Sequence, residues 1–279
     1  MKKLEERIFK FLMIGSTALI LSLLLYILYI ILMKGLPSLS WEMISQIPSG
    51  GFYLGKEGGI LNAIMGSLYL IFFSVLISLC ISVPVVMYLN FTLRRKSKLA
   101  AIARLTFDVL FGIPSIVYGA FGFTLMIYFG LQASLLGGII AITLLIIPVM
   151  IRSIDEVAIL IPNELIEATK SLGATNYETI KVVTRQLLPG ISTAVLLSIG
   201  RGIGDAATVL FTAGYTDSIP SSLLQPTASL PLAIFFQLSS PIEEVQNRAY
   251  SAALVLTIII LILSFSARYF SRRLSKNKI

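Results

Sequence analysis

The chain has 279 residues, of which 56% are hydrophobic and only 13% are charged, and its mean hydropathy is +0.90. That composition excludes a soluble domain, which would have nowhere to bury so much apolar surface, and it predicts an all-α polytopic membrane protein. The formal net charge is +8, but the basic residues cluster beside apolar segments, as topology determinants do, so we expect no nucleic-acid partner. With no histidine and one isolated cysteine, Cys80, we expect no metal site and no disulfide framework.

The first two apolar segments predict two membrane spans. Residues 11–33 follow a charged, net-basic tail and are too long for the apolar part of a cleaved signal peptide, so we expect them to remain as the first span. Residues 34–59 form a loop with few positive charges. The second span is expected at 60–91, with a potential break at Pro84. The basic cluster at 94–98 then indicates a turn on the cytoplasmic side.

A proline interrupts the third predicted span. The span begins with Arg104 and Asp108, which are four residues apart and able to pair on one helical face. Pro114 lacks the backbone N–H that a helix needs, so we expect a kink or a break there, with or without a role in ligand contact. The fourth span is expected at 135–151, with Arg152 at its cytoplasmic end.

Residues 163–190 form the only long polar insert in the chain. Asn163 is expected to cap a short helix that Gly173 ends in the left-handed conformation. Thr175 followed by Glu178 forms a capping box, which predicts that a second helix starts at once. Such an elbow between two apolar spans either packs on its own helix bundle or protrudes and docks on another protein. The residues alone do not decide between these two possibilities.

The fifth predicted span carries two charges inside an apolar segment. It is expected to start at Pro189, which suits the first turn of a helix, and to end at about residue 212. Arg201 then lies about 18 Å along the helix from Pro189, near the middle of a hydrocarbon core about 30 Å thick. Asp205 is one turn further on the same face. Arg201 either only neutralises Asp205 or faces a transport path, where its planar donor fork suits an oxyanion.

Gly200 and Gly204 flank these charges and are expected to let a neighbouring helix pack closely. The proline-rich segment 215–246 carries few ionised residues and is placed outside the cell, with a short helix at 232–238. The sixth span, 249–269, ends in a basic cluster. Six spans with basic clusters at both ends place both termini in the cytoplasm, together with the elbow between spans four and five.

Three dipeptides of the elbow resemble a known family. They are Glu167-Ala168, Gly173-Ala174 and Leu188-Pro189. They resemble the coupling loop of permease subunits in type I ATP-binding-cassette (ABC) importers, although Arg185-Gln186 stand where that family usually has Leu-Pro. The resemblance implies that the elbow docks on an ATPase subunit. Because no G-x-x-x-x-G-K-[ST] motif occurs, we expect no cofactor in this chain and expect a separate chain to bind and hydrolyse ATP.

The fifth span resembles a narrower group within that family. Residues 200–214 are similar to a signature of the A-type permeases of phosphate-specific importers, in which the position of Asp205 is usually Glu. Residues 112–119 also resemble a stretch of those permeases, and Arg152 matches a second arginine of theirs. The resemblance implies that Arg201, Asp205 and Arg152 line the substrate path. Arg152 fits equally well as an anchor on the cytoplasmic side.

The resemblance runs from about residue 60 to the C-terminus. It implies one permease domain over 1–279 with the type I ABC importer permease fold, a core at 60–270 and a coupling loop at 153–190. The implied location is the plasma (inner) membrane of a prokaryote, in contact with lipid. The implied partners are a homologous C-type permease, two copies of an ATPase subunit and an extracytoplasmic phosphate-binding protein.

The implied function is import of inorganic phosphate without covalent change, so we expect a permease that is not an enzyme and has no catalytic residue. A permease for sulfate, molybdate or another anion is the closest alternative. A secondary transporter driven by an ion gradient is disfavoured because such a carrier needs no loop that docks on an ATPase. A membrane-embedded enzyme is disfavoured because histidine is absent and paired acids are few.

Overall fold

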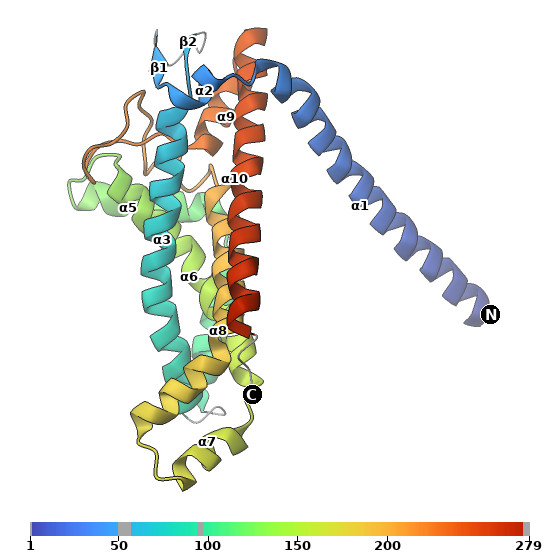
Figure 1. Ribbon diagram of the computed structural model, residues 1–279, viewed down its shortest axis with the longest axis vertical. Coiled ribbons are helices and arrows are strands. Elements are labelled where there is room, and N and C mark those ends of the chain that lie inside the picture. The colour runs from blue at the N-terminus through green and yellow to red at the C-terminus, as the bar shows by residue number, and fades with distance from the viewer. Residues whose placement is uncertain (1, 50–56, 94–96, 276–279) are drawn as a thin grey trace.

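The computed structural model describes residues 2–49, 57–93 and 97–275, and most of them are helical (Figure 1). In chain order the elements are α1 (Lys2–Ser38), α2 (Trp41–Ser45), β1 (Pro48–Ser49), β2 (Glu57–Gly58), α3 (Leu61–Met87), the π-helix η1 (Tyr88–Thr92), α4 (Lys98–Phe111), α5 (Ser115–Tyr128), α6 (Leu135–Ile159), α7 (Asn163–Ser171), α8 (Asn176–Ile203), α9 (Leu230–Leu238) and α10 (Glu243–Ser275). The two short strands pair antiparallel. Part of the predicted basic cluster, residues 94–96, lies outside the described residues.

Five helices in this part of the chain are long and apolar enough to cross a membrane: α1, α3 with η1, α6, α8 and α10. The pair α4 and α5 meets the same criteria together, but it is bent by 100° at the break between the two helices. Pro114 stands at that break and is the N-cap of α5. The six expected spans are therefore present when the bent pair is taken as one of them.

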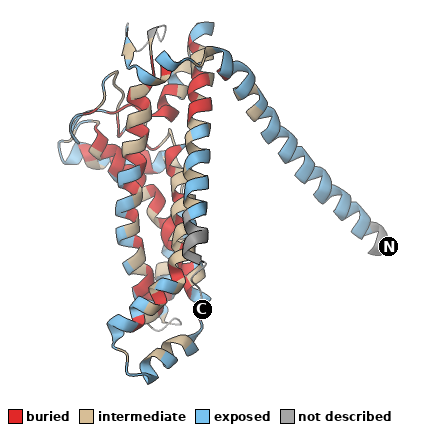
Figure 2. Cartoon of the chain, in the orientation of Figure 1, coloured by how far each residue is buried: buried red, intermediate tan, exposed pale blue. Residues whose placement is uncertain are grey.

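Helix α6 lies at the centre of the bundle, and most of its residues are buried (Figure 2). Its residues 135–151 carry no charged side chain and are apolar on nearly all sides, which is the pattern of a helix surrounded by others. Hydroxyl groups help α3 to pack on it: Ser74 donates to the carbonyl of Ile139 at 3.0 Å, and Ser78 donates to that of Thr143 at 3.5 Å. In lipid the hydrophobic effect does not drive helices together, so hydrogen bonds of this kind help to hold them in contact.

Helix α1 stands apart from the bundle over most of its length (Figure 1). Its most apolar stretch has no buried residue. Only its C-terminal end packs on α10, where the Ser251 hydroxyl donates to the carbonyl of Gly35 at 2.7 Å. A Cβ at Gly35 would lie 2.7 Å from the carbonyl oxygen of Tyr250, so this contact requires glycine. The apolar surface of α1 is thus left for lipid or another chain.

Two prolines differ from expectation, because Pro84 was a potential break and Pro189 was expected to start a new helix. Helix α3 continues through Pro84 and passes directly into η1. Pro189 lies inside α8, so the second elbow helix and the fifth span are one continuous helix and no new helix starts there. Prolines are tolerated inside membrane helices because neighbouring side chains and local adjustments satisfy the freed carbonyls. The carbonyl that Pro189 frees is that of Arg185, one turn earlier in α8.

Three helix ends also differ from expectation. Helix α6 continues beyond residue 151 to Ile159. Asn163 is not the cap of α7, because Pro162 occupies that position and gives no side-chain hydrogen bond. The fifth span ends at Ile203, nine residues before 212, because the backbone leaves the helix at Gly204. The expected short helix at 232–238 is confirmed as α9, whose first turn is buried against the bundle.

Candidate functional site

The break between α4 and α5 opens a cavity of about 480 Å³. Its wall consists of residues 111–115, Leu145 of α6, Gly200 and Arg201 in the last turns of α8, and Gly204 and Asp205 just after that helix. The cavity exists because α5 leaves α4 at 100° after Pro114, so no helix fills the space beside the last turn of α8. Pro114 thus does more than bend a span, since it helps to form this wall.

Arg201 lies in the last turn of α8 and is partly buried. Its guanidinium carbon lies 5.1 Å from the ring centroid of Phe111, the last residue of α4. That distance is within the range of a cation–π contact. Among the ion pairs of the described residues, none joins Arg201 to Asp205. The cation is therefore held by an aromatic ring rather than by the acid four residues away.

Asp205 lies beyond the end of α8, so the expectation that it continues the same helical face is wrong. Its carboxylate accepts a hydrogen bond from the Thr208 amide at 3.3 Å and a short one from the Thr208 hydroxyl. This is the arrangement of an N-cap residue that starts a turn. Arg201 and Asp205 line the same cavity, but each has its own contact.

The close packing expected at Gly200 and Gly204 does not occur among the residues that the structure describes. A Cβ at Gly200 would meet no atom within 4 Å, and one at Gly204 would meet only the carbonyl oxygen of Gly200 at 3.8 Å. The close approach is instead at Gly202, where a Cβ would lie 2.7 Å from the Cδ1 of Ile71 in α3. Gly200 and Gly204 therefore leave the cavity wall free of side chains beside Arg201.

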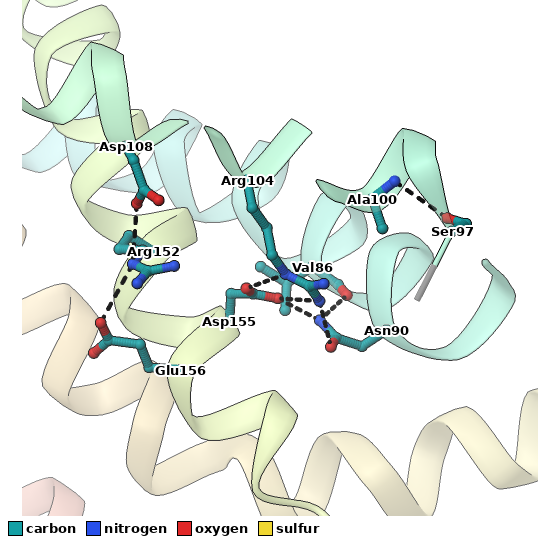
Figure 3. Close-up of polar contacts among 9 residues, drawn as sticks. All are labelled: Val86, Asn90, Ser97, Ala100, Arg104, Asp108, Arg152, Asp155 and Glu156. Atoms are coloured by element: carbon teal, nitrogen blue, oxygen red, sulfur yellow. Dashed lines mark hydrogen bonds and ion pairs between the residues drawn. The ribbon is translucent and has the colours of Figure 1, made fainter. Parts of the chain in front are cut away.

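A second polar cluster joins α4 and α6 to η1 at the end of the bundle nearest α7 (Figure 3). The Arg104 guanidinium binds Asp155 through Nε to Oδ2 at 2.8 Å and through a second donor to Oδ1 at 3.3 Å. Asn90 closes the cluster, donating to Asp155 and accepting from Arg104 at 3.0 Å. Asp155 is only 1% exposed, so all three groups satisfy one another inside the protein.

Arg152 forms a neighbouring pair of contacts in Figure 3. Its Nε lies 3.2 Å from Asp108 of α4 and 3.3 Å from Glu156 one turn along α6. The predicted pairing of Arg104 with Asp108 is therefore wrong, because each of them pairs with α6 instead. Arg152 does not line the cavity beside Arg201, and two carboxylates already face its guanidinium.

Sequence reasoning did not find the cluster of Arg104, Asp155 and Asn90. The signal was present in the spacing: α4 offers opposite charges four residues apart, and α6 offers Arg152 and Asp155 three residues apart. Both spacings put the two charges of a helix on one face, so the charges of α4 can pair with those of α6 when the two helices pack. The contact with Phe111 gave no such signal, because it depends on where the break aims the end of α4.

The elbow protrudes from the end of the bundle, as Figure 1 shows. Gly173 has φ +82°, which confirms the expected left-handed end of the first helix. The capping box of Thr175 and Glu178 is confirmed as well. Leu165 and Ile166 pack on the bundle core, so one side of α7 is attached to its own chain.

The outer side of the elbow is exposed in the part of the chain that the structure describes. The coupling residues expected from the sequence are the exposed Glu167, Ala168 and Gly173 and the partly buried Ala174. Two large apolar side chains stand out beside them: Leu172 is 89% exposed and Tyr177 is 75% exposed. Apolar groups this exposed at a protruding tip are typical of a surface that contacts another protein.

The chain has the architecture of a membrane-embedded permease subunit. Residues 81–276, more than half of the chain, match the family described as binding-protein-dependent transport system inner membrane component. The chain belongs to this family, whose members are permease subunits of ABC importers, and it is a multi-pass protein of the inner membrane. The matched residues include the cavity, the cluster around Asp155 and the elbow.

The chain is also similar to individual named proteins. The chain is 35% identical over 254 residues to the phosphate transport system permease protein PstA of Pasteurella multocida, covering 91% of this chain and 89% of the relative. It is 35% identical over 214 residues to PstA 1 of Mycobacterium tuberculosis, covering 75% and 69%. A solved structure with the same fold is the inward-facing MetNI methionine ABC transporter, with a TM-score of 0.63, 19% identity and coverage of 77% of this chain and 95% of that one.

Proposed function

We propose that this chain is the A-type permease subunit of an ATP-driven importer for inorganic phosphate. The observation that carries the proposal is Arg201, an arginine in the wall of a cavity, whose donor fork binds no carboxylate among the described residues. A partly buried cation of this kind is costly in a membrane, and such residues typically mark a substrate path. The relatives named as phosphate permeases support phosphate as the anion.

The guanidinium of Arg201 supplies the positive charge for the anion. Its planar fork donates two parallel hydrogen bonds to an oxyanion, and these are stronger inside a low-dielectric cavity than in water. Asp205, on the same wall, places a negative charge near the anion. Phosphate near neutral pH keeps a proton that a carboxylate accepts in a hydrogen bond, whereas fully ionised sulfate has none to give. Arg201 and Asp205 would therefore select phosphate over sulfate a second time, after the external binding protein.

Arg152 was expected on the same path, but its two carboxylate contacts support another role. We propose that it lies at the cytoplasmic exit and holds α4 against α6 through Asp108. An anion would have to displace Asp108 or Glu156 to reach it. Its contribution to transport would then be the position of α4, and with it the wall of the cavity at Phe111.

The surrounding complex follows from the family. An ABC importer requires ATPase subunits and a second permease, and we propose a homologous C-type permease, two copies of the ATPase and an external phosphate-binding protein. The permease domain would comprise residues 1–279, with a core at 60–270 and a coupling segment at 153–190 whose tip at Glu167, Ala168, Gly173 and Ala174 docks on the ATPase. Both termini would lie in the cytoplasm. ATP would be bound by the ATPase, and this chain would carry no cofactor.

Uptake by the purified complex in lipid vesicles tests the proposal. We expect radiolabelled phosphate to accumulate only when the binding protein and ATP are both supplied, and an excess of sulfate or molybdate to leave uptake unchanged. Uptake of sulfate or molybdate in place of phosphate would establish the alternative anion permease. Uptake driven by an ion gradient without the ATPase would show a secondary transporter.

A further inference from the structure

The contact between Arg201 and Phe111 joins two helix ends that are far apart in the sequence. Phe111 ends α4 and is 47% exposed, and Arg201 stands in the last turn of α8. Both line the same cavity, and the guanidinium carbon lies 5.1 Å from the ring centroid. Arg104 and Arg152, by contrast, are held by carboxylates.

The two ways of holding an arginine leave different groups free. A carboxylate binds the edge of the guanidinium and occupies the N–H donors that an incoming oxyanion needs. An aromatic ring attracts the cation through the quadrupole of its face and takes none of those hydrogen bonds. An arginine that rests on a ring is thus stabilised in a cavity while its donor fork stays available.

We propose that Phe111 is a positioning residue for Arg201: it fixes the guanidinium at the cavity while leaving its donors free for the transported anion. This inference rests on the proposed function of Arg201 as the anion-binding group. It also gives the break at Pro114 a purpose, since the break ends α4 at the place where its last side chain reaches α8. Asp205 supports the arrangement because its carboxylate faces Thr208.

The test compares three replacements of Phe111 in the complete complex. Phe111→Leu keeps an apolar side chain but removes the ring, Phe111→Trp keeps a ring with a stronger quadrupole, and Phe111→Glu offers a carboxylate that captures the fork. The readout is the number of phosphate ions moved per ATP hydrolysed, in vesicles supplied with saturating binding protein. A merely structural role would lower assembly and ATP hydrolysis together and leave this ratio unchanged.

We expect Phe111→Leu to lower the ratio about three- to tenfold, the range that cation–π energies of this kind allow. Phe111→Trp should stay near the unmodified complex, and Phe111→Glu should lose phosphate movement. Phe121→Leu is the matched control, because Phe121 is a similarly exposed aromatic of the same bent pair outside the cavity wall, and it should have no effect. If Phe111→Leu does not assemble, Phe111→Met replaces it in the comparison.

An unchanged ratio in Phe111→Leu would overturn the inference, and so would a Phe111→Trp variant as impaired as Phe111→Leu. Arg201→Gln, measured in parallel, separates this failure from that of the proposed function. If Arg201→Gln moves phosphate normally, the anion site itself is misplaced. If Arg201→Gln is inactive while Phe111→Leu is normal, only the role of Phe111 is refuted.

Discussion

Arg201 shows how a charge is tolerated in a segment that is otherwise apolar. An arginine at the centre of a membrane helix costs at least about 2.5 kcal/mol on insertion scales, so it needs a partner or a wet cavity. This chain supplies both, a cavity of about 480 Å³ and the ring of Phe111. Because neither takes up the hydrogen-bond donors of the guanidinium, the residue remains able to bind an anion.

The side chain of Asp205 is expected to stabilise the turn after α8 through its hydrogen bond with the Thr208 amide. Asp205→Asn should keep uptake within about threefold and leave thermal stability unchanged, because an amide oxygen caps the Thr208 amide as well as a carboxylate does. Asp205→Ala should lose about 0.5–2 kcal/mol of stability, because the cap is removed. Thermal unfolding in detergent and phosphate uptake in vesicles measure the two effects. Equal loss of stability in both variants would show that the charge, not the hydrogen bond, holds this turn.

The elements α4 and α6 are joined by one buried and one exposed ion pair, which should differ in strength. Arg104→Met leaves the carboxylate of Asp155 buried without its cation, and such a change costs about 3–5 kcal/mol. Asp108→Asn removes a partner of the partly exposed Arg152 and should cost at most about 1 kcal/mol. Denaturation midpoints of the two variants make the comparison. Similar midpoints would mean that the buried cluster does not hold the helices together.

The elbow gives a prediction in which two glycines can be compared. Gly173→Val forces a β-branched residue into positive φ, at a cost of about 1–2 kcal/mol or more, and should misdirect the start of α8. We expect a folded, membrane-inserted subunit that binds little ATPase and moves little phosphate. Gly130→Val is the control: Gly130 also has positive φ, and at both positions a Cβ would meet nothing within 4 Å. Normal ATPase binding by Gly173→Val, or equal loss in Gly130→Val, would place the docking site elsewhere.

The features that sequence predicted correctly are local ones. The capping box at Thr175 and the left-handed Gly173 depend on a few neighbouring residues, and the spans depend on apolar length. The errors lie where tertiary packing decides. Pro84 and Pro189 stay inside helices because the surrounding bundle stabilises them, contrary to their local preference.

The candidate site was predictable only in part. Arg201 was identified because an arginine in an apolar segment is conspicuous in any sequence. The absence of an ion pair between Arg201 and Asp205 was not predictable, because it depends on α8 ending before Asp205, with Gly204 as its C-cap. The roles of Phe111 and Asp155 depend on contacts between helices that are distant in the sequence, and periodicity within one helix carries no information about them.

At the scale of the whole molecule, the six-span arrangement predicts which loops share a side of the membrane. In a background without Cys80, cysteines placed at Ser97 and Ser275 should react only from the cytoplasm. Cysteines at Ser49 and Ser222 should react only from outside. Labelling of intact cells with an impermeant thiol reagent makes the measurement. Reaction at Ser97 from outside would mean that α4 and α5 do not complete a sixth span.

The central claim is that Arg201 handles the anion and does more than neutralise Asp205. Phosphate uptake by vesicles with the assembled complex tests it in Arg201→Gln, Asp205→Asn and the double variant, with Arg268→Gln, an exposed arginine of α10, as control. We predict that Arg201→Gln abolishes uptake, that the double variant stays inactive, and that the control is unaffected. Near-normal uptake by the double variant would contradict the claim, because removing both charges together would then have repaired the only defect.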